Sequence, residues 1–186
     1  MTLPNILTLM RILAIPFFAI SLWYGHHGKA CAIFAAAGFT DLLDGYIARR
    51  FDMKSDLGAI LDPMADKLLM TTAFILMAWP RDHYVAQVPV WVAILAISRD
   101  LMISLFSFMT FARGGSLQGS PSLLGKLTTA TALLAISLGL LMNALGPQPW
   151  QRWLNPWMYY LVAALVLASG IHYYLRSHHQ PAPSAL

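Results

Sequence analysis

The chain has 186 residues, of which 58% are hydrophobic and only 11% are charged. Soluble domains carry about 25% charged residues, so this composition excludes an ordinary soluble domain and predicts an integral membrane protein of one domain. The net charge of +4 does not indicate a nucleic-acid partner, because the basic residues are scattered among segments that would face lipid. The single cysteine, Cys31, excludes a disulfide within the chain.

In chain order, six stretches are long and apolar enough to be membrane-spanning helices. No charged segment precedes the first stretch, so we interpret it as a retained span and not as a signal peptide. Runs rich in Gly, Pro, Ser and charge separate the stretches and predict loops. We therefore expect an all-α fold of six transmembrane helices in one domain over residues 1–176, followed by a disordered tail over residues 177–186. The expected spans are residues 4–23, 29–48, 63–79, 88–111, 123–145 and 153–175.

The distribution of Lys and Arg predicts the orientation of these spans. With the N-terminus in the cytoplasm, nine basic residues lie on or near the cytoplasmic side, and only Lys29, Arg81 and Arg152 lie on the other. Cytoplasmic loops carry such an excess, so the loop between the second and third spans is expected in the cytoplasm. Tryptophan and tyrosine gather at the ends of the spans, as in an interfacial aromatic belt.

Carboxylates are concentrated around that loop, because six of the eight acidic residues, all Asp, lie between residues 41 and 67. On a helix that turns about 100° per residue, Asp41, Asp44, Gly45, Ala48 and Arg49 fall within about 140° of one face of the second span. The small residues leave room beside the carboxylates, and the arginine offers a planar donor to a phosphate.

Asp62 and Asp66 are four residues apart, so they share one face of the third span. Two helices joined by a short loop pack antiparallel, which would bring all four carboxylates together. Such a cluster needs a cation in a low-dielectric setting, and oxygen ligands suit Mg²⁺, Mn²⁺ or Ca²⁺ and not zinc. Two divalent ions would offset the four negative charges. Together with an arginine that can donate hydrogen bonds to phosphate, they indicate a membrane-embedded site for a pyrophosphate-containing substrate.

Three alternatives compete with this interpretation. The carboxylates could be structural charges in paired contacts, although four on shared faces with Gly, Ala and Arg disfavour this. They could belong to a membrane cation carrier, but they lie at span ends and no internal repeat is visible. An Asp-rich prenyl transferase also binds diphosphate through magnesium, but it lacks the D-G-x-x-A-R continuation.

The segment from Asp41 to Asp66 resembles the signature of the CDP-alcohol phosphatidyltransferases, D-x₂-D-G-x₂-A-R-x₈-G-x₃-D-x₃-D. Eight fixed residues match over 26 positions. "LPNILTLMRI", "ISRD" and "GKLTT" resemble further landmarks of that family, so the resemblance covers most of the chain.

The resemblance implies a six-helix membrane enzyme, commonly a homodimer, that uses CDP-diacylglycerol as donor and releases CMP. It also implies two divalent metals, Mg²⁺ or Mn²⁺, and a general base among their ligands. We expect a bacterial inner (cytoplasmic) membrane location, with the site at the cytoplasmic ends of the second and third spans. The residues carried over are Asp41, Asp44, Asp62 and Asp66 for metal, Asp66 also as base, and Gly45, Ala48, Arg49 and Gly58 for CDP.

Asn5, Thr8 and Arg11 lie on or near one helical face at the cytoplasmic end of the first span. They could cap the helix or contact the nucleotide, and we assign Asn5 and Thr8 to the CDP site. Arg99 and Lys126 are assigned to the acceptor. The alternative interpretations are a structural ion pair of Arg99 with Asp100 and a Lys126 that contacts solvent or lipid phosphate.

The acceptor alcohol is predicted from charges that are missing. Family members that use glycerol 3-phosphate tend to carry two further cations, where this chain has Ser107 and Thr128. Those cations suit a phosphate dianion. We therefore expect phosphatidylglycerol as the acceptor, which gives cardiolipin. Glycerol 3-phosphate is the alternative acceptor, and another alcohol such as inositol phosphate or serine is the third candidate.

Overall fold

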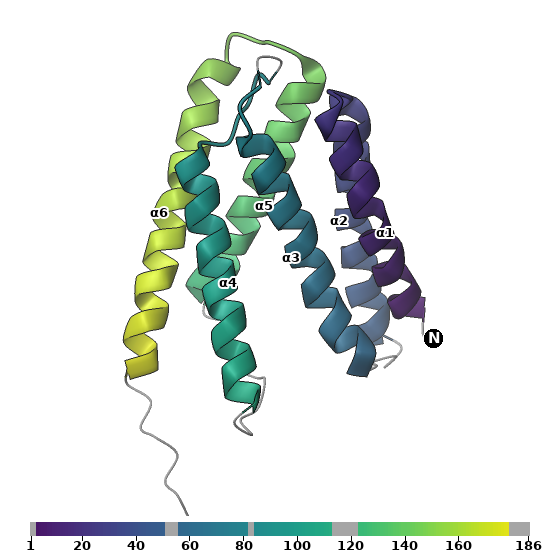
Figure 1. Cartoon of the computed structure of the whole chain (residues 1–186), viewed down its shortest axis with the longest axis vertical. Helices are drawn as coiled ribbons and strands as arrows, with labels where there is room; N and C mark the ends of the chain where they lie inside the picture. Colours follow the sequence, from purple (N-terminus) through teal and green to yellow (C-terminus); the bar gives the residue numbers. More distant parts are fainter. Residues whose placement is uncertain (1–2, 51–55, 82–83, 113–122, 179–186) are drawn as a thin grey trace, which may run out of the picture. The chain divides into compact units, whose positions relative to one another are not determined.

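The computed structural model describes residues 3–50, 56–81, 84–112 and 123–178. Within its helices it describes no side chains at positions 3–5, 42, 44–50, 56–57, 59–60, 106–112 and 174–178. In these described segments the regular structure is entirely helical (Figure 1). The helices are α1 (Leu3–Trp23), α2 (His27–Arg50), α3 (Asp56–Ala78), α4 (Val90–Ala112), α5 (Leu123–Leu145) and α6 (Gln151–His178).

The helix bounds agree with the predicted spans, except at the start of α3. That helix begins at Asp56, seven residues before the predicted start at Pro63, and the proline lies inside it. Pro63 lacks the N–H that would bond one turn back, and its ring crowds the carbonyl there, but membrane helices tolerate proline where other groups satisfy the freed carbonyl. The helix is therefore longer than the apolar span expected from the sequence. At the other end of the chain, α6 continues to His178, and the rest of the predicted tail lies outside the described residues.

Three of the described helices are long and apolar enough to cross a membrane by length and composition, namely α1, α5 and α6. Together with the all-helical architecture they confirm an all-α membrane protein. The count of six spans stays a prediction.

The chain divides into two compact units, the first formed by residues 1–88 and 136–155. In this unit α1 packs against both α2 and α3. Figure 1 shows the start of α1, the end of α2 and the start of α3 gathered at the same end of the unit. Small residues are among the buried ones of α2 and α3, and such residues let membrane helices approach closely. Buried examples are Ala30, Ala37, Ala65 and Ala73.

The loop between α3 and α4 is held by one side chain of α5. The buried Asn143 accepts hydrogen bonds through Oδ1 from the N–H groups of Val85 and Ala86, both at 2.8 Å, and donates from Nδ2 to the Ala86 carbonyl at 2.9 Å. The Val88 N–H bonds the Met77 carbonyl at 3.1 Å. These bonds satisfy backbone groups that irregular structure would otherwise leave unpaired beside apolar helices.

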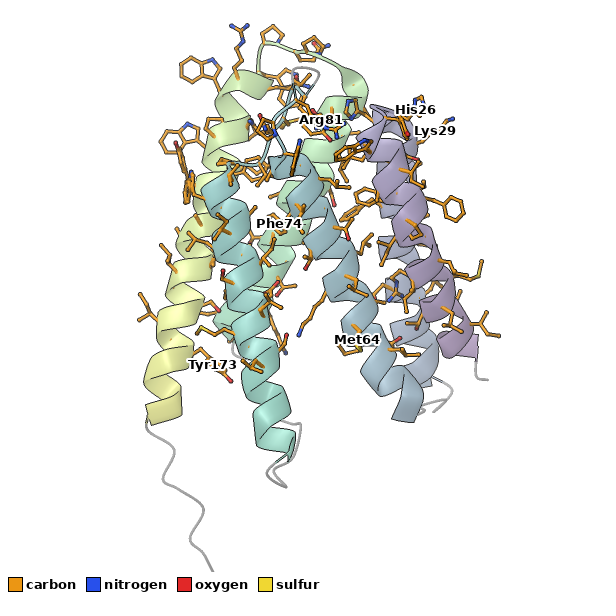
Figure 2. The ribbon with its side chains drawn as sticks, viewed as in Figure 1. His26, Lys29, Met64, Phe74, Arg81 and Tyr173 are labelled. Carbon is orange, nitrogen blue, oxygen red and sulfur yellow. The ribbon has the colours of Figure 1, made fainter. Side chains whose placement is uncertain are left out.

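Aromatic side chains and one arginine close the end of this unit opposite the Asp-rich helix ends. The Arg81 guanidinium lies 3.9 Å from the ring centroid of Trp23 and donates a hydrogen bond to the Trp23 carbonyl, which caps the end of α1. Burial raises the pKa of the nearby Tyr84 phenol, and the Arg81 charge partly opposes this shift. Figure 2 shows Arg81 at one end of the unit and Met64, which lies between Asp62 and Asp66 in sequence, at the other.

The second unit comprises residues 89–135 and 156–186. Here α6 bonds to both other helices: Arg99 on α4 donates to Ser169 Oγ at 2.8 Å, and Thr128 on α5 donates to the Leu165 carbonyl at 3.2 Å. Trp91 stacks on Tyr160 with ring centroids 6.0 Å apart. Polar bonds between helices inside an apolar unit fix which helix faces meet.

Candidate functional site

Asp41 and Asp62 both lie at the end of the first unit where α2 ends and α3 begins. Asp41 stands in the second half of α2, and Asp62 and Asp66 stand near the start of α3. Their sequence separation of about 20 residues is closed by the antiparallel arrangement of the two helices around α1 (Figure 1). The predicted meeting of the Asp-bearing ends of the second and third helices is thus consistent with the fold.

Arg11 of α1 forms an ion pair with Asp41 of α2. The guanidinium Nη1 lies 2.9 Å from Asp41 Oδ1. The exposure of the partners differs sharply, because 1% of the Arg11 side chain is exposed compared with 44% of the Asp41 side chain. The arginine therefore approaches the carboxylate from the protein interior, and the rest of the Asp41 side chain faces outward.

Thr8 of α1 makes the corresponding contact with α3. Its hydroxyl donates a hydrogen bond to Asp62 Oδ1. Thr8 is fully buried, whereas Asp62 is half-buried. Thr8 and Arg11 are three residues apart and so share one face of α1. That face reaches one carboxylate on each neighbouring helix.

The remaining predicted site residues are described only in part. The backbone positions of Asp44, Gly45, Ala48 and Arg49 lie in the final turns of α2, and their side chains lie outside the described ones, as does that of Asn5. Gly58 is buried in the first turn of α3. Among the described side chains, which do not include Asp44, no three His, Cys, Asp or Glu residues are grouped closely enough to hold a metal ion. The four-carboxylate metal set and the CDP contacts stay predictions.

The two residues assigned to the acceptor lie in the second unit, Arg99 on α4 and Lys126 on α5. Arg99 Nη1 lies 2.7 Å from Asp100 Oδ1, and its Nη2 bonds Ser169. The ion pair considered from the sequence is therefore present. Lys126 is exposed in the first turn of α5. Arg99 retains a buried Nε for which the described residues offer no partner.

Thr128 does not offer a free hydroxyl where a glycerol 3-phosphate enzyme tends to carry a cation. It is 2% exposed and donates to the Leu124 carbonyl at 2.7 Å and the Leu165 carbonyl at 3.2 Å. A lysine at this position would replace a side chain that bonds one carbonyl of α5 and one of α6. Ser107, the second such position, has its side chain outside the described set.

Sequence analysis placed Arg11 on one helix face with Asn5 and Thr8 but did not assign it to a site. It lies in an apolar segment and outside the Asp-rich motif, so the motif does not identify it. Two signals were available: a charged residue inside a membrane span usually pairs with another charge, and Arg11 shares a helix face with Thr8. The partner helix could not be named from the sequence, because the pair joins positions 30 residues apart.

Comparison with known proteins identifies the family of this chain. The family model of the CDP-alcohol phosphatidyltransferases matches residues 1–170. A cardiolipin synthase (CMP-forming)/mitochondrial hydrolase fusion protein of Schizosaccharomyces pombe is 36% identical over 92% of this chain, and a probable phosphatidylglycerophosphate synthase of Mycobacterium tuberculosis is 38% identical over 73%. The chain spans 30% of the first of these proteins and 64% of the second, less than two thirds of either.

A CDP-diacylglycerol–glycerol-3-phosphate 3-phosphatidyltransferase of Shigella flexneri serotype 5b is 31% identical, and the match covers 92% of both chains. The family match, the similarity to this relative and the motif of eight fixed residues on α2 and α3 all indicate the same family. The chain belongs to the CDP-alcohol phosphatidyltransferase family.

Proposed function

We propose that the protein transfers a phosphatidyl group from CDP-diacylglycerol to an alcohol and releases CMP. The observation that carries this proposal is the complete family motif on α2 and α3, with Asp41 and Asp62 both contacted by buried side chains of α1 at one end of the first unit. A cation carrier would not require the Gly, Ala and Arg positions of the motif, and its charged residues would stand nearer the middle of the spans.

The donor set at this end of the unit fits two divalent cations, Mg²⁺ or Mn²⁺. The donors are carboxylate oxygens, and the Asp41 side chain remains 44% exposed beside its arginine. Asp41, Asp44, Asp62 and Asp66 would hold the ions. When bound, the cations neutralise the donor pyrophosphate and favour CMP as leaving group.

In the proposed reaction Asp66 is the general base. The acceptor hydroxyl oxygen forms a bond to the phosphorus that carries the diacylglycerol, and the bond from that phosphorus to the CMP oxygen breaks. The hydroxyl proton passes to the Asp66 carboxylate. Gly45, Ala48, Arg49, Gly58 and Asn5 would line the CDP site, with Arg49 donating to phosphate oxygens.

The proposed acceptor is phosphatidylglycerol, so that the product is cardiolipin. The charge around Arg99 supports this choice, because its contact with Asp100 offsets part of its positive charge and Thr128 supplies no cation. A phosphodiester monoanion needs less compensating charge than the dianion of glycerol 3-phosphate, which would be poorly matched in a partly desolvated site. Arg99 and Lys126 would contact the acceptor phosphate.

Glycerol 3-phosphate is the second candidate acceptor. Two of the relatives described above are named phosphatidylglycerophosphate synthase or glycerol-3-phosphate 3-phosphatidyltransferase, and one of them is matched over 92% of its length. Identity to these two proteins is 38% and 31%, values on either side of the 36% identity to the cardiolipin synthase. Overall similarity therefore does not separate the acceptors.

We further propose that the protein is a homodimer of a bacterial inner membrane with the Asp-rich end facing the cytoplasm. The nine-to-three distribution of Lys and Arg supports this orientation. The position of Arg81 and Lys29 in Figure 2, at the end of the first unit opposite Met64, agrees with it.

The test is a product analysis with purified protein in lipid nanodiscs. CDP-diacylglycerol and Mn²⁺ are supplied with labelled phosphatidylglycerol or labelled glycerol 3-phosphate, and lipids and CMP are identified by mass spectrometry. The proposal expects CMP and cardiolipin with phosphatidylglycerol. Phosphatidylglycerophosphate without cardiolipin would establish the second acceptor, and absence of CMP with either acceptor would refute the phosphatidyl transfer.

A further inference from the structure

Two buried polar side chains of α1 point at the carboxylates of two different helices. Thr8 is fully buried and donates to Asp62 of α3, and Arg11, with 1% of its side chain exposed, pairs with Asp41 of α2. Burying a hydroxyl and a guanidinium inside an apolar helix is unfavourable unless each has a partner. Two of the four residues that the proposed function assigns to metal are among these partners.

Both contacts have the same geometry relative to the protein surface. In each pair the α1 residue is the more deeply buried member and the Asp is the more exposed one. A carboxylate has two oxygens with about four acceptor positions, so one interior bond leaves other positions for an outward-facing cation. The interior bond also fixes the rotation of the carboxylate about its side chain.

Groups that hold metal ligands from behind are a general feature of protein metal sites. Such partners orient the ligand before the cation arrives, and their loss typically lowers metal affinity or activity about 10- to 100-fold. The same face of α1 reaches α2 through Arg11 and α3 through Thr8, so one helix sets the relative orientation of carboxylates on the other two.

We infer that Thr8 and Arg11 are positioning residues that orient Asp62 and Asp41 for divalent cations. This inference rests on the proposed function, since it takes those carboxylates as metal ligands. It gives Thr8 a role different from the nucleotide contact expected from the sequence, because its hydroxyl is buried and bonded to Asp62. Thr8 then acts on the donor only through the cation.

The test measures Mn²⁺ affinity directly, by electron paramagnetic resonance on the purified full-length protein. Thr8→Val keeps the shape of the side chain and removes the donor, and it is expected to weaken Mn²⁺ binding about tenfold. Thr8→Ser restores a hydroxyl and should recover most of that affinity. At saturating Mn²⁺, the KM for CDP-diacylglycerol of Thr8→Val should equal that of the wild type.

Arg11→Lys provides a second variant that does not depend on Thr8→Val folding. Lysine keeps the positive charge but lacks the planar fork of the guanidinium, so the change alters geometry more than charge. Mn²⁺ affinity is expected to fall several-fold. The matched control is Thr128→Val, which removes another buried threonine hydroxyl, one bonded to backbone carbonyls of α5 and α6. Its Mn²⁺ affinity should be unchanged.

The outcomes separate this inference from the proposed function. Wild-type affinity for Mn²⁺ in both Thr8→Val and Arg11→Lys would overturn the positioning role while leaving the metal site intact. A raised KM for CDP-diacylglycerol in Thr8→Val, with unchanged Mn²⁺ affinity, would overturn the positioning role and support direct contact of Thr8 with the nucleotide. A wild-type protein that binds no Mn²⁺ and releases no CMP would overturn the proposed function, and this inference with it.

Discussion

Asp66 has a different predicted role from the other carboxylates of the motif, because it is assigned both to metal and to proton transfer. Asp66→Asn keeps the size of the side chain and one oxygen ligand but removes the base. We expect CMP release to fall about 100-fold or more, with a smaller effect on donor binding. Steady-state rates and binding of a radiolabelled donor measure the two effects separately.

The comparison variant for Asp66 is Asp41→Asn, which should reduce Mn²⁺ affinity as well as the rate. A rate for Asp66→Asn within a few-fold of the wild type would contradict the base assignment. Equal losses of donor binding and rate in both variants would show that the two carboxylates serve the metal alone.

Asp100 offers a test of how charge selects the acceptor. It pairs with Arg99 at 2.7 Å and lies on the same helix, so Asp100→Asn removes the negative charge and keeps the shape. If Arg99 contacts the acceptor, its freed charge should favour the dianion, and use of glycerol 3-phosphate relative to phosphatidylglycerol should rise several-fold. Competition between the two acceptors, with products quantified by mass spectrometry, measures the ratio. An unchanged ratio would favour a structural role for the pair.

At the scale of single elements, α1 has two distinct faces. The outward face carries large apolar side chains spaced alternately four and three residues apart, all exposed in the isolated chain and suited to lipid. The inward face carries Thr8, Arg11, Phe18 and Leu22, all buried. One helix therefore combines a lipid surface, an apolar contact with its neighbours and two polar contacts with Asp-bearing helices. The exposed residues are Ile6, Met10, Leu13, Phe17 and Ile20.

The loop between α3 and α4 depends on Asn143 of α5. Asn143→Ala removes three hydrogen bonds and leaves the backbone groups of Val85 and Ala86 without these partners. Each unsatisfied buried group typically costs about 1–3 kcal/mol, so we expect the free energy of unfolding to fall by roughly 3 kcal/mol. Thermal unfolding in detergent should show a Tm several degrees lower, while Mn²⁺ affinity stays at the wild-type value. A Tm equal to that of the wild type would show that water replaces the amide.

At the scale of the whole molecule, the distribution of Lys and Arg predicts which side of the membrane each loop faces. In a protein with Cys31 replaced by Ser, single cysteines at positions 29 and 54 should react with a membrane-impermeant maleimide from opposite sides. Lys29 is exposed near the start of α2, and Lys54 lies in the loop outside the described residues. Labelling from the same side would exclude the six-span topology.

Removal of metal tests the whole active site at once. Chelation with EDTA should abolish CMP release, and Mg²⁺ or Mn²⁺ should restore it. Zn²⁺ should restore it poorly, because it prefers nitrogen and sulfur ligands in tetrahedral sites. Activity that persists after exhaustive chelation would refute the metal assignment without affecting the family membership.

The sequence by itself determined the membrane class, the bounds of most helices and the family. These follow from local quantities: apolar length sets a span, Gly and Pro end it, and eight fixed residues in 26 positions identify the motif. The third expected span covers residues 63–79, whereas α3 begins at Asp56, so the apolar span and the helix do not start at the same residue.

Only the tertiary structure decided what Arg11, Thr8 and Thr128 contact. Each of these side chains is polar in an apolar segment, so the sequence predicts that it has a partner but not which one. The partner lies on another helix, at Asp41, Asp62 and the Leu165 carbonyl. The choice depends on how the helices are rotated about their axes, and burial of the apolar residues of several helices together sets that rotation.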